Sequence, residues 1–207
     1  MEKKDNKLPV YEMYIDEKDI NNEDAGVFAV SLVDKPAIIA EYMVFNDSGT
    51  HFKFKATDME QRIVTGAVMI PGMPIYRNEP TKGEFYVVAS KETINYAAMG
   101  FMKQGLTKSV NMMHEASLIP EGVFIFESWV IDSTRGTQEP VGFKKCPEGT
   151  WFMSMKIDNQ EVWDEFIKTG ILRGFSIEGS FKLREQPSVD AGVLAGLEEL
   201  LGNRNKN

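Results

Sequence analysis

Few side chains in this sequence combine the types and spacing that acid–base or nucleophilic chemistry requires. His114 closes the segment Val110–His114, and Ser176 lies between the glycines of Gly174–Gly179. Glycines let a substrate or other backbone approach a strand closely. A serine becomes a nucleophile when a base accepts its proton and a third group orients that base. The sequence therefore predicts acyl transfer by Ser176 with His114 as the base.

Each of these two residues also has a purely structural interpretation. Strand alternation places His114 on one face with Val110 and Met112, where a histidine is often a satisfied structural residue. Ser176 would then lie on the polar face of a bulged strand. Gly179 is one residue too far from Ser176 for a Gly-x-Ser-x-Gly elbow, and the sequence predicts no helix directly after it.

The third member of a catalytic group must be a carboxylate that can orient His114. Glu127 is the first choice, because it lies between Ile125 and Trp129 on one strand face and a buried carboxylate needs a partner. An exposed glutamate at a sheet edge is the alternative interpretation. Four other acids remain open as weaker choices: Asp34, Glu115, Asp132 and Glu178.

Other reactive side chains are less favoured. His51 follows the turn at 47–50 and is expected in an exposed loop. Cys146 precedes a surface turn, although Lys144 and Lys145 could lower the pKa of its thiol. One cysteine and two histidines exclude a multi-cysteine or histidine-rich metal site. The acidic segment 21–24 lacks calcium-loop spacing, so we expect neither metal nor cofactor.

Composition limits the partners of the chain. It has 207 residues, with 23 Lys and Arg against 31 Asp and Glu, giving a net charge of −8. A non-specific nucleic-acid binder would need a basic surface. No apolar run approaches the roughly 18–20 residues of a membrane span, and the polar first residues do not resemble a secretory signal. We expect a soluble, intracellular globular protein without nucleic-acid or membrane partners.

The elements that must position these residues are mostly strands. Short apolar and β-branched segments, cut by Gly and Pro, predict strands at 26–33, 63–70, 85–89, 110–114, 123–131, 150–156 and 171–183. Ser90 predicts the start of a helix that ends before Gly105. Asp158 with Glu161 forms a capping-box pattern, and Gly170 suits the end of that second helix.

The chain divides into a body and two tails. Residues 1–8 are expected to be a disordered tail, and residues 9–184 to form one β-rich domain. Residues 185–207 are expected to form a linker and an amphipathic helix, because apolar residues recur with the helical period of 3.6 residues. That helix would either dock on the domain or serve as a handle for a partner.

Several motifs, in their order along the chain, carry a family resemblance. They are Val30–Ala37, Met69-Ile-Pro71 with Tyr76-Arg77, His114, Glu127-Ser-Trp129, Thr150-Trp151 with Val162-Trp163, and Gly174–Gly179. Together they resemble the XkdF-like prohead proteases of tailed bacteriophages over residues 8–183.

The resemblance implies an α+β fold of the herpesvirus-assemblin type, a mostly antiparallel closed β-barrel ringed by a few helices. It implies a serine endopeptidase in which His114 matches the family's histidine and Ser176 its nucleophile. The expected substrates are phage scaffold and major capsid proteins, and the protease itself. The expected location is the host cytoplasm, inside the assembling procapsid, and homodimerisation is an open option.

One departure from the related proteases predicts a circular permutation. In them, a stretch like Val30–Ala37 follows the nucleophile, whereas here it precedes both His114 and Ser176. The strand at 26–33 should therefore pair beside the strand at 172–182; otherwise it is simply another core strand. Ala29 occupies the position of the family's third catalytic residue, which leaves that role to Glu127. By the same resemblance, the oxyanion donors would lie near Asp34 and Lys35.

Two functions of other classes compete with the protease. The first is a catalytically inactive structural or scaffold-docking protein on the same fold, which the alanine at position 29 and the C-terminal amphipathic segment favour. The second is an unrelated ligand-binding barrel, which would hold a deep apolar pocket and no Ser–His pair.

Overall fold

The computed structural model describes residues 8–19, 22, 24–34, 55–58, 61–143 and 146–185. His51, Lys35, Lys144 and Lys145 lie outside the described residues. So do residues 1–7 of the predicted N-terminal tail and residues 186–207, which include the predicted C-terminal helix. The predicted boundaries of the tails stay predictions.

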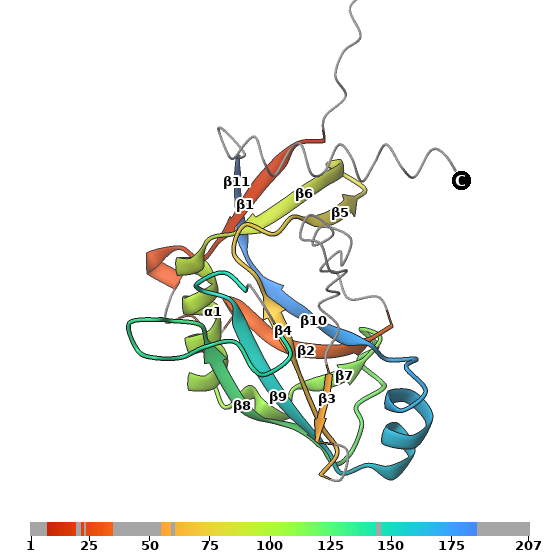
Figure 1. Ribbon diagram of the computed structural model, residues 1–207. Helices are drawn as coiled ribbons and strands as arrows, with labels where there is room; N and C mark the ends of the chain where they lie inside the picture. Colours follow the sequence, from red (N-terminus) through yellow and green to blue (C-terminus); the bar gives the residue numbers. More distant parts are fainter. Residues whose placement is uncertain are drawn as a thin grey trace, which may run out of the picture.

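The described strands form three sheets (Figure 1). The first has the order β11-β1-β6-β5, made of Lys182–Glu185, Val10–Tyr14, Gly83–Ala89 and Ile75–Glu79. The second has the order β10-β2-β7, made of Gly174–Ser180, Gly26–Val33 and Val110–Met112. The third has the order β3-β4-β9-β8, made of Lys55–Asp58, Ile63–Met69, Trp151–Ile157 and Val123–Val130. In Figure 1 the β10-β2-β7 sheet lies between the other two.

Most neighbouring strands run antiparallel, but β1 with β6 and β2 with β7 run parallel. The chain passes from β10 into β11 through Phe181 alone, so it leaves the second sheet and joins the first within one residue. This passage connects the strand that carries Ser176 to the edge of the first sheet.

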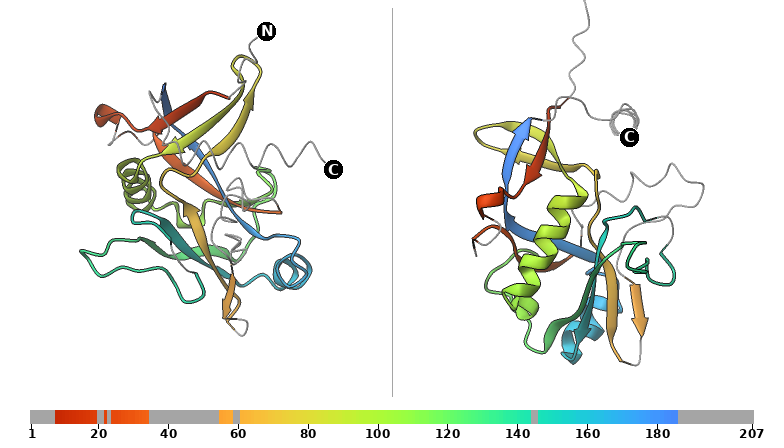
Figure 2. Two further views of the ribbon diagram at one scale, coloured as in Figure 1. Left: turned by 45° about the horizontal axis from the view of Figure 1, so that its top comes forward. Right: turned by 90° about the vertical axis from the view of Figure 1, so that its left-hand side faces the viewer.

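One apolar core draws side chains from all three sheets and from α1, Lys91–Lys103. Its largest fully buried members include Trp151, Trp163, Phe85 and Phe101. α1 contacts β2, β8 and β9, and the right-hand view of Figure 2 shows it lying in front of the sheets. The helix thus packs against strands of the second and third sheets.

The fold class is α+β, as the resemblance implied, but the described strands do not close into a barrel. Each sheet keeps two edge strands within the described residues, which are β11 and β5, β10 and β7, and β3 and β8. The expected assemblin-like closed barrel is therefore not found here. The physical difference lies in the hydrogen-bonded ladders, which end at these edges.

Both predicted helices are present, with one change in geometry. Ser90 caps α1 through a hydrogen bond that its Oγ accepts from the Thr93 N–H at 3.2 Å. The second helix, η4 at Val162–Ile167, is a π-helix. Residues 160 and 161 are helical and precede η4. Before them, the side chain of Asn159, not that of Asp158, accepts from the Val162 N–H at 3.0 Å. Gly170 has a φ of 71°, as the C-terminal position required.

The strand predictions agree closely for the long apolar segments and miss three short strands. β2 has the predicted bounds, and the predicted segment at 171–183 divides into β10 and β11 at Phe181. Sequence reasoning missed β1, β3 and β5. The segments of β3 and β5 mix charged and polar residues with few apolar ones, whereas β1 is mostly apolar and aromatic but only five residues long. Two short 3-10 turns, η1 at Glu17–Asp19 and η3 at Leu106–Lys108, complete the described elements.

Candidate active site

The candidate site lies on one face of the β10-β2-β7 sheet. Ser31 of β2 is directly opposite Ser176 of β10 on one side and Asn111 of β7 on the other. Residues directly opposite each other share a face, with Cβ atoms about 4.5–5.5 Å apart in an antiparallel pair. The neighbouring positions Val30 and Phe175 point to the other face, into the core. Core packing on one side therefore aligns three polar side chains on the other.

His114 reaches this face through a tight turn at the end of β7. The Glu115 N–H donates to the Met112 carbonyl at 3.0 Å, and the two residues between them, Met113 and His114, have φ values of 57° and 60°. Positive φ at both central positions is the pattern of a type I′ turn, which normally selects Asn and Gly. The Met113 N–H also donates to the Leu32 carbonyl at 2.9 Å, which anchors the turn on β2.

This turn corrects the predicted face of His114. Alternation along a strand at 110–114 would place His114 with Val110, which is buried in the core. The strand ends at Met112 instead, and the left-handed residues redirect the imidazole to the face of Asn111. The predicted involvement of His114 in a polar site therefore rests on a turn, not on strand periodicity.

Four side chains, including that of His114, form a network of polar contacts on this face. Nδ1 lies 3.0 Å from the Ser31 Oγ and 3.3 Å from Oε1 of Glu178. The Ser31 Oγ also lies 2.6 Å from the Asn111 Oδ1 and 2.9 Å from the Glu178 Oε1. The Asn111 Nδ2 donates to the same Glu178 oxygen at 2.6 Å. We call Ser31, Asn111, His114 and Glu178 the histidine network.

The charge of Glu178 is stabilised within this network. Partial burial alone would raise the pKa of Glu178, but hydrogen bonds from Asn111, Ser31 and His114, together with the charge of His114, outweigh it and hold the pKa below its ordinary value. The Glu178 side chain is 27% exposed and that of His114 is 44% exposed. The site thus pairs an ionised carboxylate with an imidazole that solvent or a substrate can reach.

Ser176 lies beside the network but forms no hydrogen bond to it. It is 6% exposed, whereas Ser31 is fully buried. Among the described residues, the hydrogen bonds of the His114 ring go to Ser31 and Glu178, and none goes to Ser176. Glu178 follows Ser176 by two positions on β10, so both side chains project from the same face. The predicted pair is therefore adjacent in the sheet without a direct bond.

Glu127 is not brought to His114. It is exposed on β8 in the third sheet, where the register shifts between Ile125 and Glu127. This irregularity removes Glu127 from the buried face that simple alternation gave it. No hydrogen bond or ion pair joins it to His114 within the described part of the chain. The carboxylate beside His114 is Glu178, one of the weaker choices from the sequence.

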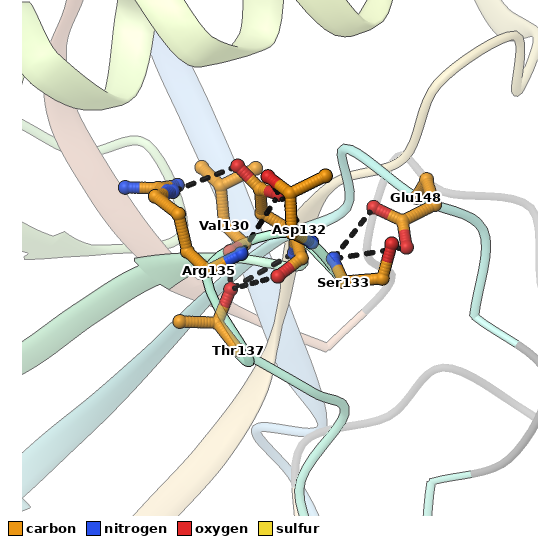
Figure 3. A network of polar contacts seen from close by, with 7 residues as sticks. Val130, Asp132, Ser133, Arg135, Thr137 and Glu148 are labelled. Carbon is orange, nitrogen blue, oxygen red and sulfur yellow. Dashed lines mark hydrogen bonds and ion pairs between the residues drawn. The ribbon is translucent and has the colours of Figure 1, made fainter.

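Asp132, another of those choices, serves the loop that follows β8 (Figure 3). Its carboxylate accepts from the Thr134 hydroxyl at 2.6 Å and from the Arg135 Nε at 2.7 Å. These hydrogen bonds lower the pKa of Asp132 to about 2. The Ser133 N–H donates to Glu148 at 3.1 Å, across the same loop. The Asp132 carboxylate thus stabilises the turn at residues 132–135.

Cys146 is poorly suited to nucleophilic chemistry. Burial raises the pKa of its thiol to about 12, and the negative charge of Glu139 adds to this shift. The reactive form of a cysteine is the thiolate, which is scarce at neutral pH under these conditions. The lysines that could have lowered the pKa are at positions 144 and 145, outside the described residues.

The described residues offer neither a metal centre nor a membrane-spanning helix. They contain no group of three or more His, Cys, Asp or Glu side chains arranged to hold a metal ion. None of their helices is both long and apolar enough to cross a membrane.

Comparison with known proteins connects this geometry to a family. Residues 51–185, more than half of the chain, match the family described as "Putative phage serine protease XkdF". The chain belongs to this family. It is also 28% identical over 190 residues to the Phage-like element PBSX protein XkdF of Bacillus subtilis (strain 168), an alignment that covers 87% of this chain. The chain spans 62% of the length of that relative. No solved structure matches it.

The region matched by the XkdF family contains most of the site. Asn111, His114, Ser176 and Glu178 lie within residues 51–185, whereas Ser31 precedes them. Sequence reasoning missed Ser31 and Asn111 as members of the site, although Ser31 lies within the motif at 30–37. The sequence did contain one signal for Ser31: it is a polar residue of β2 between two core residues, Val30 and Leu32.

Proposed function

We propose that this protein is a serine endopeptidase in which Ser176 is the nucleophile, His114 the general base and Glu178 the carboxylate that orients it. The observation that carries the proposal is the Glu178–His114 contact on the same sheet face as Ser176, at 3.3 Å from Oε1 to Nδ1. A carboxylate at Nδ1 of a histidine holds the ring and stabilises the imidazolium formed when the other nitrogen takes a proton.

The proposed reaction is acyl transfer in two halves. The Ser176 Oγ attacks the scissile carbonyl carbon while its proton passes to Nε2 of His114, and an oxyanion forms. When this intermediate collapses, the C–N bond breaks and Nε2 returns the proton to the leaving amine. Water then repeats the sequence on the acyl-enzyme and releases the second product. Backbone N–H donors near Asp34 and Lys35 are the expected oxyanion site.

The missing bond between Ser176 and His114 needs an explanation under this proposal. Hydrogen bonds between catalytic groups are often long in a free enzyme and tighten when substrate binds. Ser176 is on β10, whose second edge is not paired within the described residues. An extended peptide added at such an edge would supply main-chain hydrogen bonds beside the nucleophile.

The proposed substrates are phage scaffold and major capsid proteins, together with the protease itself, cleaved within the procapsid in the host cytoplasm. They follow from the resemblance to prohead proteases and from the phage origin in the family description. Homodimerisation remains a prediction under the same resemblance.

Co-expression with the neighbouring phage scaffold and capsid proteins, followed by intact-mass spectrometry, tests the proposal. The wild type is compared with Ser176→Ala and with Ser180→Ala, which removes an exposed hydroxyl from the same strand. We expect clipped products from the wild type and from Ser180→Ala, and none from Ser176→Ala. Equal clipping by Ser176→Ala would refute Ser176 as the nucleophile.

A second function is favoured by one observation, the absence of a Ser176–His114 hydrogen bond among the described residues. This function is a catalytically inactive scaffold-docking protein on the same fold. It predicts intact chains in every co-expression, with the scaffold protein retained on the purified chain.

A further inference from the structure

Ser31 is the residue of the histidine network whose role the proposed reaction leaves open. Its hydroxyl contacts three acceptor-capable atoms, the Asn111 Oδ1 at 2.6 Å, the Glu178 Oε1 at 2.9 Å and the His114 Nδ1 at 3.0 Å. A serine hydroxyl has a single proton, so it can donate to only one of these at a time. The distribution of protons in the network therefore decides what Ser31 can do.

The carboxylate fixes that distribution. An ionised Glu178 only accepts hydrogen bonds, so its 3.3 Å contact with Nδ1 is favourable when Nδ1 carries a proton. Hydrogen bonds from Asn111 and His114 help to hold the pKa of Glu178 below its ordinary value, which keeps it ionised at neutral pH. A bare Nδ1 would place a nitrogen lone pair against a carboxylate.

With the proton on Nδ1, every hydrogen-bond donor of the network has an acceptor. The His114 Nδ1–H donates toward Ser31 and Glu178, the Ser31 hydroxyl donates to the Asn111 Oδ1, and the Asn111 Nδ2 donates to Glu178. If Ser31 gave its proton to Nδ1 instead, the Asn111 Oδ1 would lose this donor. Buried polar groups strongly favour the arrangement that satisfies them all.

We propose that Ser31 and Asn111 are positioning residues that fix His114 in the tautomer with its proton on Nδ1, which leaves Nε2 as the base for Ser176. This proposal rests on the proposed peptidase function for its catalytic meaning. Burial supports it, because Ser31 is 0% exposed whereas Ser176, also buried, keeps 6% of its surface exposed.

The backbone contributes to the same end. Met113 and His114 both have positive φ, a conformation that is unfavourable for residues other than glycine. Such strain persists where the surroundings hold it in place. The hydrogen bonds of Ser31 and Asn111 hold the imidazole, and the Met113–Leu32 bond holds its backbone.

The first test measures the tautomer without any need for activity. Long-range ¹H–¹⁵N NMR correlations report which ring nitrogen carries the proton, and His51→Gln removes the signal of the second histidine. We expect neutral His114 in the wild type to carry its proton on Nδ1, and Ser31→Ala to give a mixture of both tautomers. A wild-type ring with its proton on Nε2 would overturn the proposal.

The matched control is Ser154→Ala. Ser154 is a buried serine of β9, in the third sheet and away from the histidine network. Its hydroxyl lies 2.9 Å from the hydroxyl of Thr65 on the neighbouring strand β4. We expect it to leave the His114 tautomer unchanged. If Ser154→Ala mixed the tautomers as much as Ser31→Ala does, the effect would be a general loss of packing and the positioning role would be refuted.

The second test maps a covalent label. A fluorophosphonate reacts when a serine oxygen bonds to phosphorus, fluoride leaves and the serine proton passes to the base. We expect the adduct on Ser176 in the wild type, and labelling on the order of ten- to a hundredfold slower, at the same residue, in Ser31→Ala and Asn111→Ala. An adduct on Ser31 would overturn the proposal.

The two tests separate the failure of this inference from that of the proposed function. If no serine is labelled but His114 carries its proton on Nδ1, the proposed peptidase function is refuted and the proposed positioning of His114 is supported. If Ser176 is labelled but His114 carries its proton on Nε2, the proposed peptidase function is supported and the positioning role of Ser31 and Asn111 is refuted.

Discussion

At the scale of single residues, the orientation of His114 depends on which carboxylate contacts Nδ1. Glu178 lies 3.3 Å from this atom, whereas Glu127 is exposed on β8. We predict that Glu178→Gln lowers kcat/KM by roughly a hundredfold or more, because an amide no longer holds the productive tautomer. Glu127→Gln should stay within about twofold, as for other surface changes. Peptidase assays on the two variants check this, and the opposite ranking would restore Glu127 as the catalytic acid.

The same residue should couple stability to pH. The folded-state pKa of Glu178 is lower than its ordinary value of 4.5, so the unfolded chain binds more protons in that range. The contribution of Glu178 is then fully present above about pH 4.5 and is lost as the pH falls through the folded-state pKa. We predict that Glu178→Gln flattens the fall in unfolding free energy between neutral and acidic pH. Urea denaturation at several pH values measures it, and parallel curves would contradict the prediction.

At the scale of elements, the site depends on how closely β10 approaches β2. The pairing register between β10 and β2 shifts after Glu178: Glu178 is opposite Ala29, whereas Gly179 is opposite Val27. A Cβ built on Gly179 would lie 2.6 Å from the Gly26 carbonyl oxygen and 2.7 Å from the Phe181 ring. A side chain here would force β10 away from β2, one residue from Glu178.

We therefore predict that Gly179→Ala destabilises the protein by about 1–3 kcal/mol, the usual range for overpacking. It should also lower activity, since Glu178 would move with the strand. Gly100→Ala is the matched control, because Gly100 lies within α1 with nothing within 4 Å of its added Cβ; it should be stabilising by about 0.5–1 kcal/mol. Thermal melts distinguish the two, and equal effects would show that the close approach is unimportant.

The elements also show how far the sequence determines the site. β2 and β10 were predicted because long apolar and β-branched runs define them, and their pairing was predicted from motif order. The turn at Met113 and His114 was not, since neither residue has the chemistry of a type I′ turn. Glu178 ranked below Glu127 because alternation within one strand does not reveal which strand lies next to it. Asn111 gave no signal, because a polar residue in a short strand is common.

At the scale of the whole molecule, the order of β2 and β10 has an evolutionary interpretation. The antiparallel pairing of residues 26–33 beside 174–180 is the arrangement that a circular permutation required. Ala29 is directly opposite Glu178. Under the predicted permutation, Glu178 would therefore lie across the ladder from the position that the resemblance assigns to the third catalytic residue. This offers a reason why an alanine at position 29 is compatible with a complete site.

The first sheet makes the permutation testable. β1 and β11 pair antiparallel, with Tyr11 opposite Glu185, so the start of one strand lies beside the end of the other. Cα atoms of directly opposite residues are about 4.5–5.5 Å apart, and two to five residues suffice for a hairpin loop. A protein that begins at residue 55, continues to 185 and passes through a short Asn-Gly loop into residues 9–54 would have the strand order that the resemblance ascribes to the related proteases.

We predict that this permuted protein folds with the same histidine network. Every pairing of β1, β2, β10 and β11 is retained in it, because only the connection changes and chain ends that lie close together tolerate such relinking. Its His114 should carry the proton on Nδ1, as in the natural order, and the melting temperature should fall by only a few degrees. As the control, the same fragments expressed without the joining loop should lose stability. A permuted protein that does not fold, beside a folded control of residues 9–185 in natural order, would show that the present order of strands is required by the fold itself.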